Sequence, residues 1–237
     1  MNKLRIALVF IISLSLFSCG DVIKGAGDVV SETRSLEPFS EIELNGIINA
    51  SFRQVKSTDV DKVVVSAQEN LLPYIKTIIE DGLLIINLEE SIHTDKDISV
   101  EIYGDSFRSL VSTGTGDMKS DGRIKLQKLS VENNSTGDIT LELEAKSIEV
   151  ELNGSGDIIF SGSTDYLELE NNGSGDLNTI GMRSFEVEVL SNGSGDVSAY
   201  AKESLDVEIN GSGDVYHKGK AELTKSLNGT GSLKKEK

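Results

Sequence analysis

Glycine, asparagine and aspartate recur together along the C-terminal half of this 237-residue chain, in an arrangement that could bind calcium. A Gly-Ser-Gly-Asp phrase, or a near copy of it, returns every 18 to 21 residues between Gly114 and Ser232. Glycine-aspartate corners of repeat-in-toxin proteins hold Ca²⁺ between turns, but their phrase is Gly-Gly-x-Gly-x-Asp with a nonapeptide period. Here the acid directly follows the second glycine, so a structural role is the preferred interpretation and calcium at the corners is the alternative.

Four consecutive copies of the phrase supply the candidate corner residues, and three of their acids are the candidate calcium ligands. The ligands are Asp157, Asp176 and Asp196. We expect the glycines to supply the positive φ of a sharp bend, and Asn and Asp to bond nearby backbone or stack from turn to turn. The corner residues are Asn153, Gly154, Gly156, Asp157, Asn172, Gly173, Gly175, Asp176, Asn192, Gly193, Gly195, Asp196, Asn210, Gly211, Gly213 and Asp214.

Two columns of acids precede the corners when the repeats are aligned on their asparagines. Glu149 and Glu168 stand four residues before the Asn, and Glu151 and Glu170 stand two residues before it. In a parallel stack these carboxylates are about one strand spacing apart and repel one another. A solvated face is the simplest interpretation, and a stripe that binds divalent cations or a basic partner is the sharper alternative.

The period predicts the fold that positions these residues. A repeat of about 19 residues, in which apolar and polar positions alternate on both sides of a glycine-rich corner, indicates an all-β parallel β-helix, or β-solenoid. We therefore expect residues 111–233 to form stacked rungs, followed by a charged tail at 234–237. The columns that contain Ile148, Val150 and Ile158 are predicted to face inward, so that the glutamates between them face solvent.

The preceding segment, residues 29–110, lacks the period. It is predicted to be mostly β and to cap the first rung, because an uncovered sheet edge invites pairing. Asn45-Gly46 predicts a hairpin turn between two strands. The apolar spacing over 70–80, with Asn70 as N-cap and Asp81-Gly82 as the stop, predicts one short helix.

The N-terminus predicts export and lipidation. Residues 1–18 combine Lys3 and Arg5 with an apolar run of about a dozen residues, as in a signal peptide. Leu16-Phe17-Ser18-Cys19 resembles the lipobox of bacterial lipoproteins, which implies acylation of Cys19 and a lipidated tether at 19–28. We expect the protein to be anchored to a membrane in the cell envelope. The outer membrane, facing the periplasm, is favoured, and surface exposure stays open.

Composition limits the partners and the chemistry. Removing the two basic residues of the signal peptide leaves 21 basic against 39 acidic residues, a net charge of −18, which disfavours nucleic acid. His93 and His217 are the only histidines, and no zinc motif or nucleophile elbow is present. We therefore expect no cofactor and no enzymatic activity, with an unknown protein or glycan as partner. A glycan-binding or polysaccharide-lyase-like β-helix is the alternative, with Arg123 and Arg183 as its basic candidates.

Three features are, in combination, specific for one protein family. They are the repeated Asn-Gly-Ser-Gly-Asp phrases from 153 to 214, the Asn70-Leu71-Leu72-Pro73-Tyr74-Ile75 segment and the strand from Phe39 to Asn45. The chain resembles the head GIN domain family of auto-transporter adhesin-like proteins, common in lipoproteins of Bacteroidetes-type bacteria. The resemblance covers roughly residues 25–232. It implies a β-helical fold with no established biochemical activity, and it supplies no catalytic residues. We expect a non-enzymatic interaction or adhesin-like surface.

Overall fold

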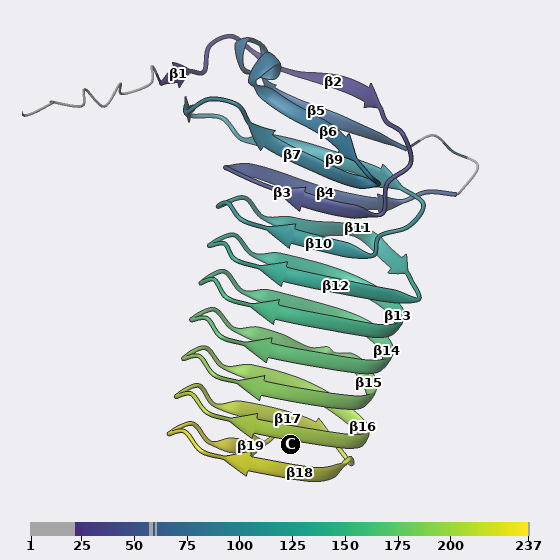
Figure 1. Cartoon of the computed structure of the whole chain (residues 1–237), viewed down its shortest axis with the longest axis vertical. Helices are drawn as coiled ribbons and strands as arrows, with labels where there is room; N and C mark the ends of the chain where they lie inside the picture. Colours follow the sequence, from purple (N-terminus) through teal and green to yellow (C-terminus); the bar gives the residue numbers. More distant parts are fainter. Residues whose placement is uncertain (1–21, 57–58, 60, 237) are drawn as a thin grey trace, which may run out of the picture.

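The computed structural model describes residues 22–56, 59 and 61–236, which form an elongated stack of β-strands (Figure 1). Seventeen strands belong to one continuous sheet that winds along the stack, and β1 (Ile23–Lys24) pairs with β8 (Ile92–His93) in a separate two-stranded sheet. The prediction of an all-β solenoid is confirmed, with about seven turns at a spacing of about 19 residues.

Each turn of the repeat is a strand, a glycine-rich corner and a second strand, paired in parallel with the turns before and after it. The long strands each serve two legs of the solenoid, as β13 does when its first half pairs with β11 and its second half with β12. The strands of this part are β10 (Ser109–Ser112), β11 (Met118–Lys125), β12 (Lys128–Asn133), β13 (Ile139–Leu152), β14 (Ile158–Asn171), β15 (Leu177–Ser191), β16 (Val197–Ile209), β17 (Val215–Gly219), β18 (Glu222–Leu227) and β19 (Leu233–Lys235).

The core is a set of apolar ladders in the predicted register. Ile148 pairs with Leu167, and Leu167 pairs with Val187, so one column of buried aliphatic side chains runs down the inside of the stack. β-branched and aliphatic residues at every second position bury one side of each strand and leave the other side to solvent. In the last turn the column reaches Leu223, which is 40% exposed because it lies at the end of the stack of described strands.

Residues 41–54 continue the solenoid, but out of chain order. β3 (Glu41–Leu44) lies in parallel between β10 and β7 (Leu83–Leu88), and β4 (Ile48–Gln54) lies in parallel between β11 and β9 (Ile98–Gly104). Figure 1 shows this insertion between the upper strands and the repeats. The hairpin predicted at Asn45-Gly46 is therefore wrong. The two residues form a solenoid corner, with a φ of 94° at Gly46, because β3 pairs with β10 and β7 and β4 pairs with β11 and β9.

The cap is antiparallel and smaller than the predicted segment 29–110. β2 (Val29–Ser35) pairs with β5 (Lys62–Gln68), which also pairs with β9, while β6 (Ile75–Glu80) pairs with β7. The boundary drawn between residues 110 and 111 falls inside β10.

The short helix of this region is a 3₁₀ helix, η1 (Glu69–Tyr74), and the helix prediction is wrong over 75–80. Asn70 lies inside η1 and accepts a hydrogen bond from the Ala26 amide at 2.7 Å instead of capping the helix. Positive φ values of 51° at Asp81 and 83° at Gly82 make that dipeptide the hairpin turn from β6 to β7.

Candidate functional site

The corner glycines are required by close stacking and not by positive φ. A Cβ atom on Gly156 would lie 2.1 Å from the carbonyl oxygen of Gly137, and one on Gly175 would lie 2.3 Å from that of Gly156. None of the corner glycines from 154 to 213 has a φ between +20° and +160°, so the sequence-based reason for them is wrong. Each turn of the corner lies directly on the previous one, and only a hydrogen atom fits between them.

The corner aspartates form a hydrogen-bonded ladder. The Asp157 amide donates to Oδ1 of Asp138 at 2.8 Å, and Oδ1 of Asp157 accepts from the Asp176 amide at 2.8 Å. The ladder continues through Asp196 to Asp214, and it begins at Asn49, whose Oδ1 accepts from the Asp117 amide at 3.0 Å. One oxygen of each corner carboxylate thus binds backbone. Asn49 was missed because the alignment of the phrases starts at residue 114.

The corner asparagines form a second ladder, as predicted for stacked amides. Nδ2 of Asn172 donates to Oδ1 of Asn153 at 3.0 Å, and Nδ2 of Asn192 donates to Oδ1 of Asn172 at 2.8 Å. Nδ2 of Asn172 also donates to Oε1 of Glu170, two residues earlier, at 2.9 Å. The amides therefore join the corner to the acidic columns beside it.

An acidic face lies on the strands that lead into the corners. Glu149 pairs in register with Glu168, Glu168 with Glu188, and Glu188 with Asp206. The second column contains Glu151, Glu170 and Glu208, but it is interrupted by Leu190. A groove of about 230 Å³ runs over this face, which we call the acidic face, and is lined by Glu168, Leu169, Glu170, Glu188, Val189, Leu190, Asp206 and Glu208.

Few cations neutralise the acidic face. Lys128 pairs with Glu149 at 2.6 Å, and no other carboxylate of the face makes an ion pair among the described residues. Burial of Tyr166 raises the pKa of its hydroxyl well above the ordinary value, and hydrogen bonding to Glu188 and Glu168 raises it further. The tyrosine is therefore a neutral donor on a face that carries uncompensated negative charge.

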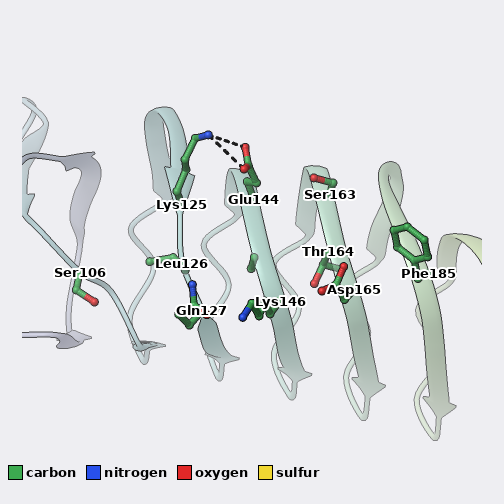
Figure 2. Close-up of a pocket in the computed structure, with 11 residues that line it drawn as sticks. Ser106, Lys125, Leu126, Gln127, Glu144, Lys146, Ser163, Thr164, Asp165 and Phe185 are labelled. Carbon is green, nitrogen blue, oxygen red and sulfur yellow. Dashed lines mark hydrogen bonds and ion pairs between the residues drawn. The ribbon is translucent and has the colours of Figure 1, made fainter.

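A second groove, of about 620 Å³, lies at the opposite bend of the rungs, where the strands turn back (Figure 2). It crosses successive turns from Gln127 through Lys146 and Asp165 to Phe185, which is 39% exposed. The ammonium of Lys202 lies 4.0 Å from the centroid of the Phe185 ring. Lys125 and Lys146 balance Glu144 and Asp165 in the lining, so this groove is locally neutral on a strongly acidic molecule. Sequence reasoning missed it, because its residues do not fall in the phrase.

The candidate metal ligands, the two histidines and the two candidate arginines do not converge on one site. Among the described residues, no group of three or more His, Cys, Asp or Glu side chains is placed to share a metal ion. His93 lies in β8 and His217 in β17, and the guanidinium of Arg123 pairs with Glu142 at 2.7 Å. Arg183 lies on an exposed rung position between Ser163 and Tyr200. Cys19 lies outside the described residues.

The model of one protein family, described as "Putative auto-transporter adhesin, head GIN domain", matches residues 38–221. The chain belongs to this family. The matched range includes β3, β4 and most of the repeat, so it covers the corners, the acidic face and the neutral groove. No curated protein matches the chain.

Solved structures share the solenoid fold at low sequence identity. A crystal structure of a putative adhesin from Bacteroides fragilis has a TM-score of 0.86 and 21% identity, covering 90% of this chain and 100% of that one. A protein from Parabacteroides distasonis described as a putative lipid binding protein has a TM-score of 0.73 and 22% identity, covering 92% of this chain and 100% of that one. A putative adhesin from Parabacteroides merdae has a TM-score of 0.72 at 19% identity, covering 92% of this chain and 100% of that one.

Among the described residues, no helix is long and apolar enough to cross a membrane.

Proposed function

We propose that the protein is a lipid-anchored β-solenoid of the cell envelope that acts as a non-enzymatic, adhesin-like interaction surface. The acidic face carries this proposal, because its carboxylates recur at every turn and present the same chemistry over several rungs. A repeated surface of one charge favours an extended basic partner and makes encounter with that partner fast at low salt.

The proposed anchor is an acyl group on Cys19, and the lipobox-like Leu16-Phe17-Ser18-Cys19 supports an envelope location. The first described residues lie beside β1, at the same end of the stack as the cap (Figure 1). A lipid on Cys19 would therefore attach the protein close to the cap, and the repeats would extend from that end. We favour the outer membrane, facing the periplasm, as the location.

The test is affinity capture from envelope extract with the anchor-free chain, in which Cys19→Ala prevents acylation. The acidic-face variant carries Glu149→Gln, Glu151→Gln, Glu168→Gln and Glu170→Gln. Its matched control removes the same charge from exposed glutamates elsewhere, through Glu69→Gln, Glu80→Gln, Glu90→Gln and Glu203→Gln. A partner that the acidic face binds is captured by the anchor-free chain and the control and lost by the acidic-face variant, and its capture weakens as salt rises.

Glycan binding is the second candidate, and the neutral groove of Figure 2 is the observation that favours it. An exposed ring at Phe185 offers an apolar face, and the amide of Gln127 and the charged groups of Lys146 and Asp165 offer hydrogen bonds for hydroxyl groups. Gln127 and Phe185 are three rungs apart, about 14 Å, which suits a short oligosaccharide. Glycan-array binding that Phe185→Ala abolishes supports this candidate, and array binding that the variant retains rejects the groove.

A further inference from the structure

The sequence contains six Asn-Gly pairs, a dipeptide prone to a specific backbone reaction. The glycine nitrogen loses its proton and attacks Cγ of the asparagine, the Cγ–Nδ2 bond breaks, and ammonia leaves as a succinimide ring closes. Water then opens the ring to aspartate or isoaspartate, so that each event consumes one water and releases one ammonia. The reaction needs a glycine amide that is free to lose its proton and a carboxamide that is free to turn.

Five of the pairs are restrained at both groups by the corner ladders. In Asn153 and Asn172, Nδ2 donates one hydrogen bond to the ladder asparagine of the preceding turn and one to the glutamate two residues earlier in the chain, at 2.9 to 3.0 Å. The glycine amides are also engaged, since those of Gly154, Gly193, Gly211 and Gly229 each donate to a backbone carbonyl at 2.9 Å. Gly173 donates to Oδ1 of Asn171 at 3.0 Å.

Asn45-Gly46 is the exception. Nδ2 of Asn45 makes one hydrogen bond, to Oε1 of Glu43 at 2.9 Å, and within the part of the chain that the structure describes its Oδ1 accepts none. The Gly46 amide likewise has no acceptor among those residues. The sequence explains the missing donor to Oδ1. Leu44 and Asn133 both pair with Ser112, so the next position aligns Asn45 with Thr113, which has no side-chain amide to donate to Oδ1 of Asn45.

We propose that Asn45 is a site of spontaneous deamidation in the folded protein, while the five ladder asparagines are protected by their hydrogen bonds. The product places a carboxylate beside Glu43 in place of a donor, so two like charges meet there. Isoaspartate also lengthens the backbone at a corner where the Gly46 carbonyl accepts from the Thr115 amide at 2.8 Å. The modification therefore weakens the turn that joins the cap to the repeats.

The experiment follows deamidation of the folded full chain at mildly alkaline pH, by peptide mapping and mass spectrometry in heavy-oxygen water. We expect each ladder asparagine to react at least about tenfold more slowly than Asn45, because at least one hydrogen bond must break before the ring can close. In urea the difference between Asn45 and the ladder positions should disappear. A ladder asparagine that reacts as fast as Asn45 in the folded chain would overturn the proposal.

A designed variant tests the cause. Thr113→Asn places a donor where the ladder is interrupted, so it should slow the reaction at Asn45 severalfold, and peptide mapping separates the introduced asparagine from Asn45. Thr136→Asn is the matched control, because it makes the same change at an exposed corner position that is not in register with Asn45. An unchanged rate at Asn45 in the Thr113→Asn variant, or equal slowing by both variants, would refute the ladder as the source of protection.

Discussion

Replacing Gly156, a buried corner residue, with alanine should destabilise the solenoid strongly, although the change adds only one methyl group. The new Cβ would lie 2.1 Å from the Gly137 carbonyl oxygen, whereas ordinary contacts begin at 3.4 Å. The two turns must therefore separate locally by more than an ångström. Three hydrogen bonds cross this gap: the amides of Ser155 and Gly156 donate to the Ser135 carbonyl at 3.0 and 3.2 Å, and the Asp157 amide donates to Asp138 at 2.8 Å.

Weakening these bonds at about 1 kcal/mol each, with the strain of the displaced backbone, gives a loss of about 2–4 kcal/mol in the free energy of unfolding. For a domain of this size the melting temperature should fall by about 5 to 15 °C. Differential scanning calorimetry measures both values. Gly181→Ala is the matched control, because a Cβ there meets nothing closer than 3.5 Å and the glycine has no positive φ. If the two variants melt together, close stacking is not the reason for the corner glycines.

The other predictions concern the anchor, the carboxylates and one histidine. Cys19→Ala should move the protein from the membrane to the soluble fraction, and a variant that stays bound through a carbonate wash would contradict lipidation. Calcium should give no saturable heat in calorimetry. If calcium instead raises the melting temperature, the Asp157→Asn, Asp176→Asn double variant will lose this rise when the ion binds at the corners. The acidic-face variant will lose it when the ion binds to the two columns of glutamates. Burial of His217, and then the charge of Lys235, lower the pKa of its imidazole below the ordinary 6.5. The unfolded chain then binds the proton more readily than the folded chain, so the free energy of unfolding should fall as pH drops below 6.5. Chemical denaturation measures this fall, and His217→Phe should remove the contribution of the histidine.

The solenoid and its register could be predicted because each repeat carries the same local pattern. Ile148 and Val150 alternate with Glu149 and Glu151, and the same alternation at the same distance from the next Asn fixes which side chains are stacked. About seven units carry this pattern, so a residue that departs from it in one unit does not change the predicted fold.

The insertion of β3 and β4 could not be predicted from local pattern. Asn45-Gly46 is the same signal in a hairpin and in a solenoid corner, and the difference lies in pairing with strands far along the chain. The Asp117 amide bonds Asn49 across 68 residues, a contact that no local sequence rule contains.

The error over 75–80 has a different origin. Ile75, Ile78 and Ile79 fit one helical face, but the run is rich in β-branched residues, which favour a strand. Asp81-Gly82 carried the correct signal as a hairpin turn and was interpreted as a helix stop. The neutral groove was missed for a third reason, because its residues come from bends whose sequence does not repeat.

The central claim is that the acidic face is the interaction surface, and binding of the anchor-free chain to envelope extract tests it most directly. We predict a salt-sensitive partner whose capture falls by about tenfold or more in the acidic-face variant and is unchanged in the control with four other glutamates replaced. Protease treatment of the extract should abolish capture if the partner is a protein, and periodate treatment should abolish it if the partner is a glycan. Equal capture by the acidic-face variant and the anchor-free chain would contradict the claim.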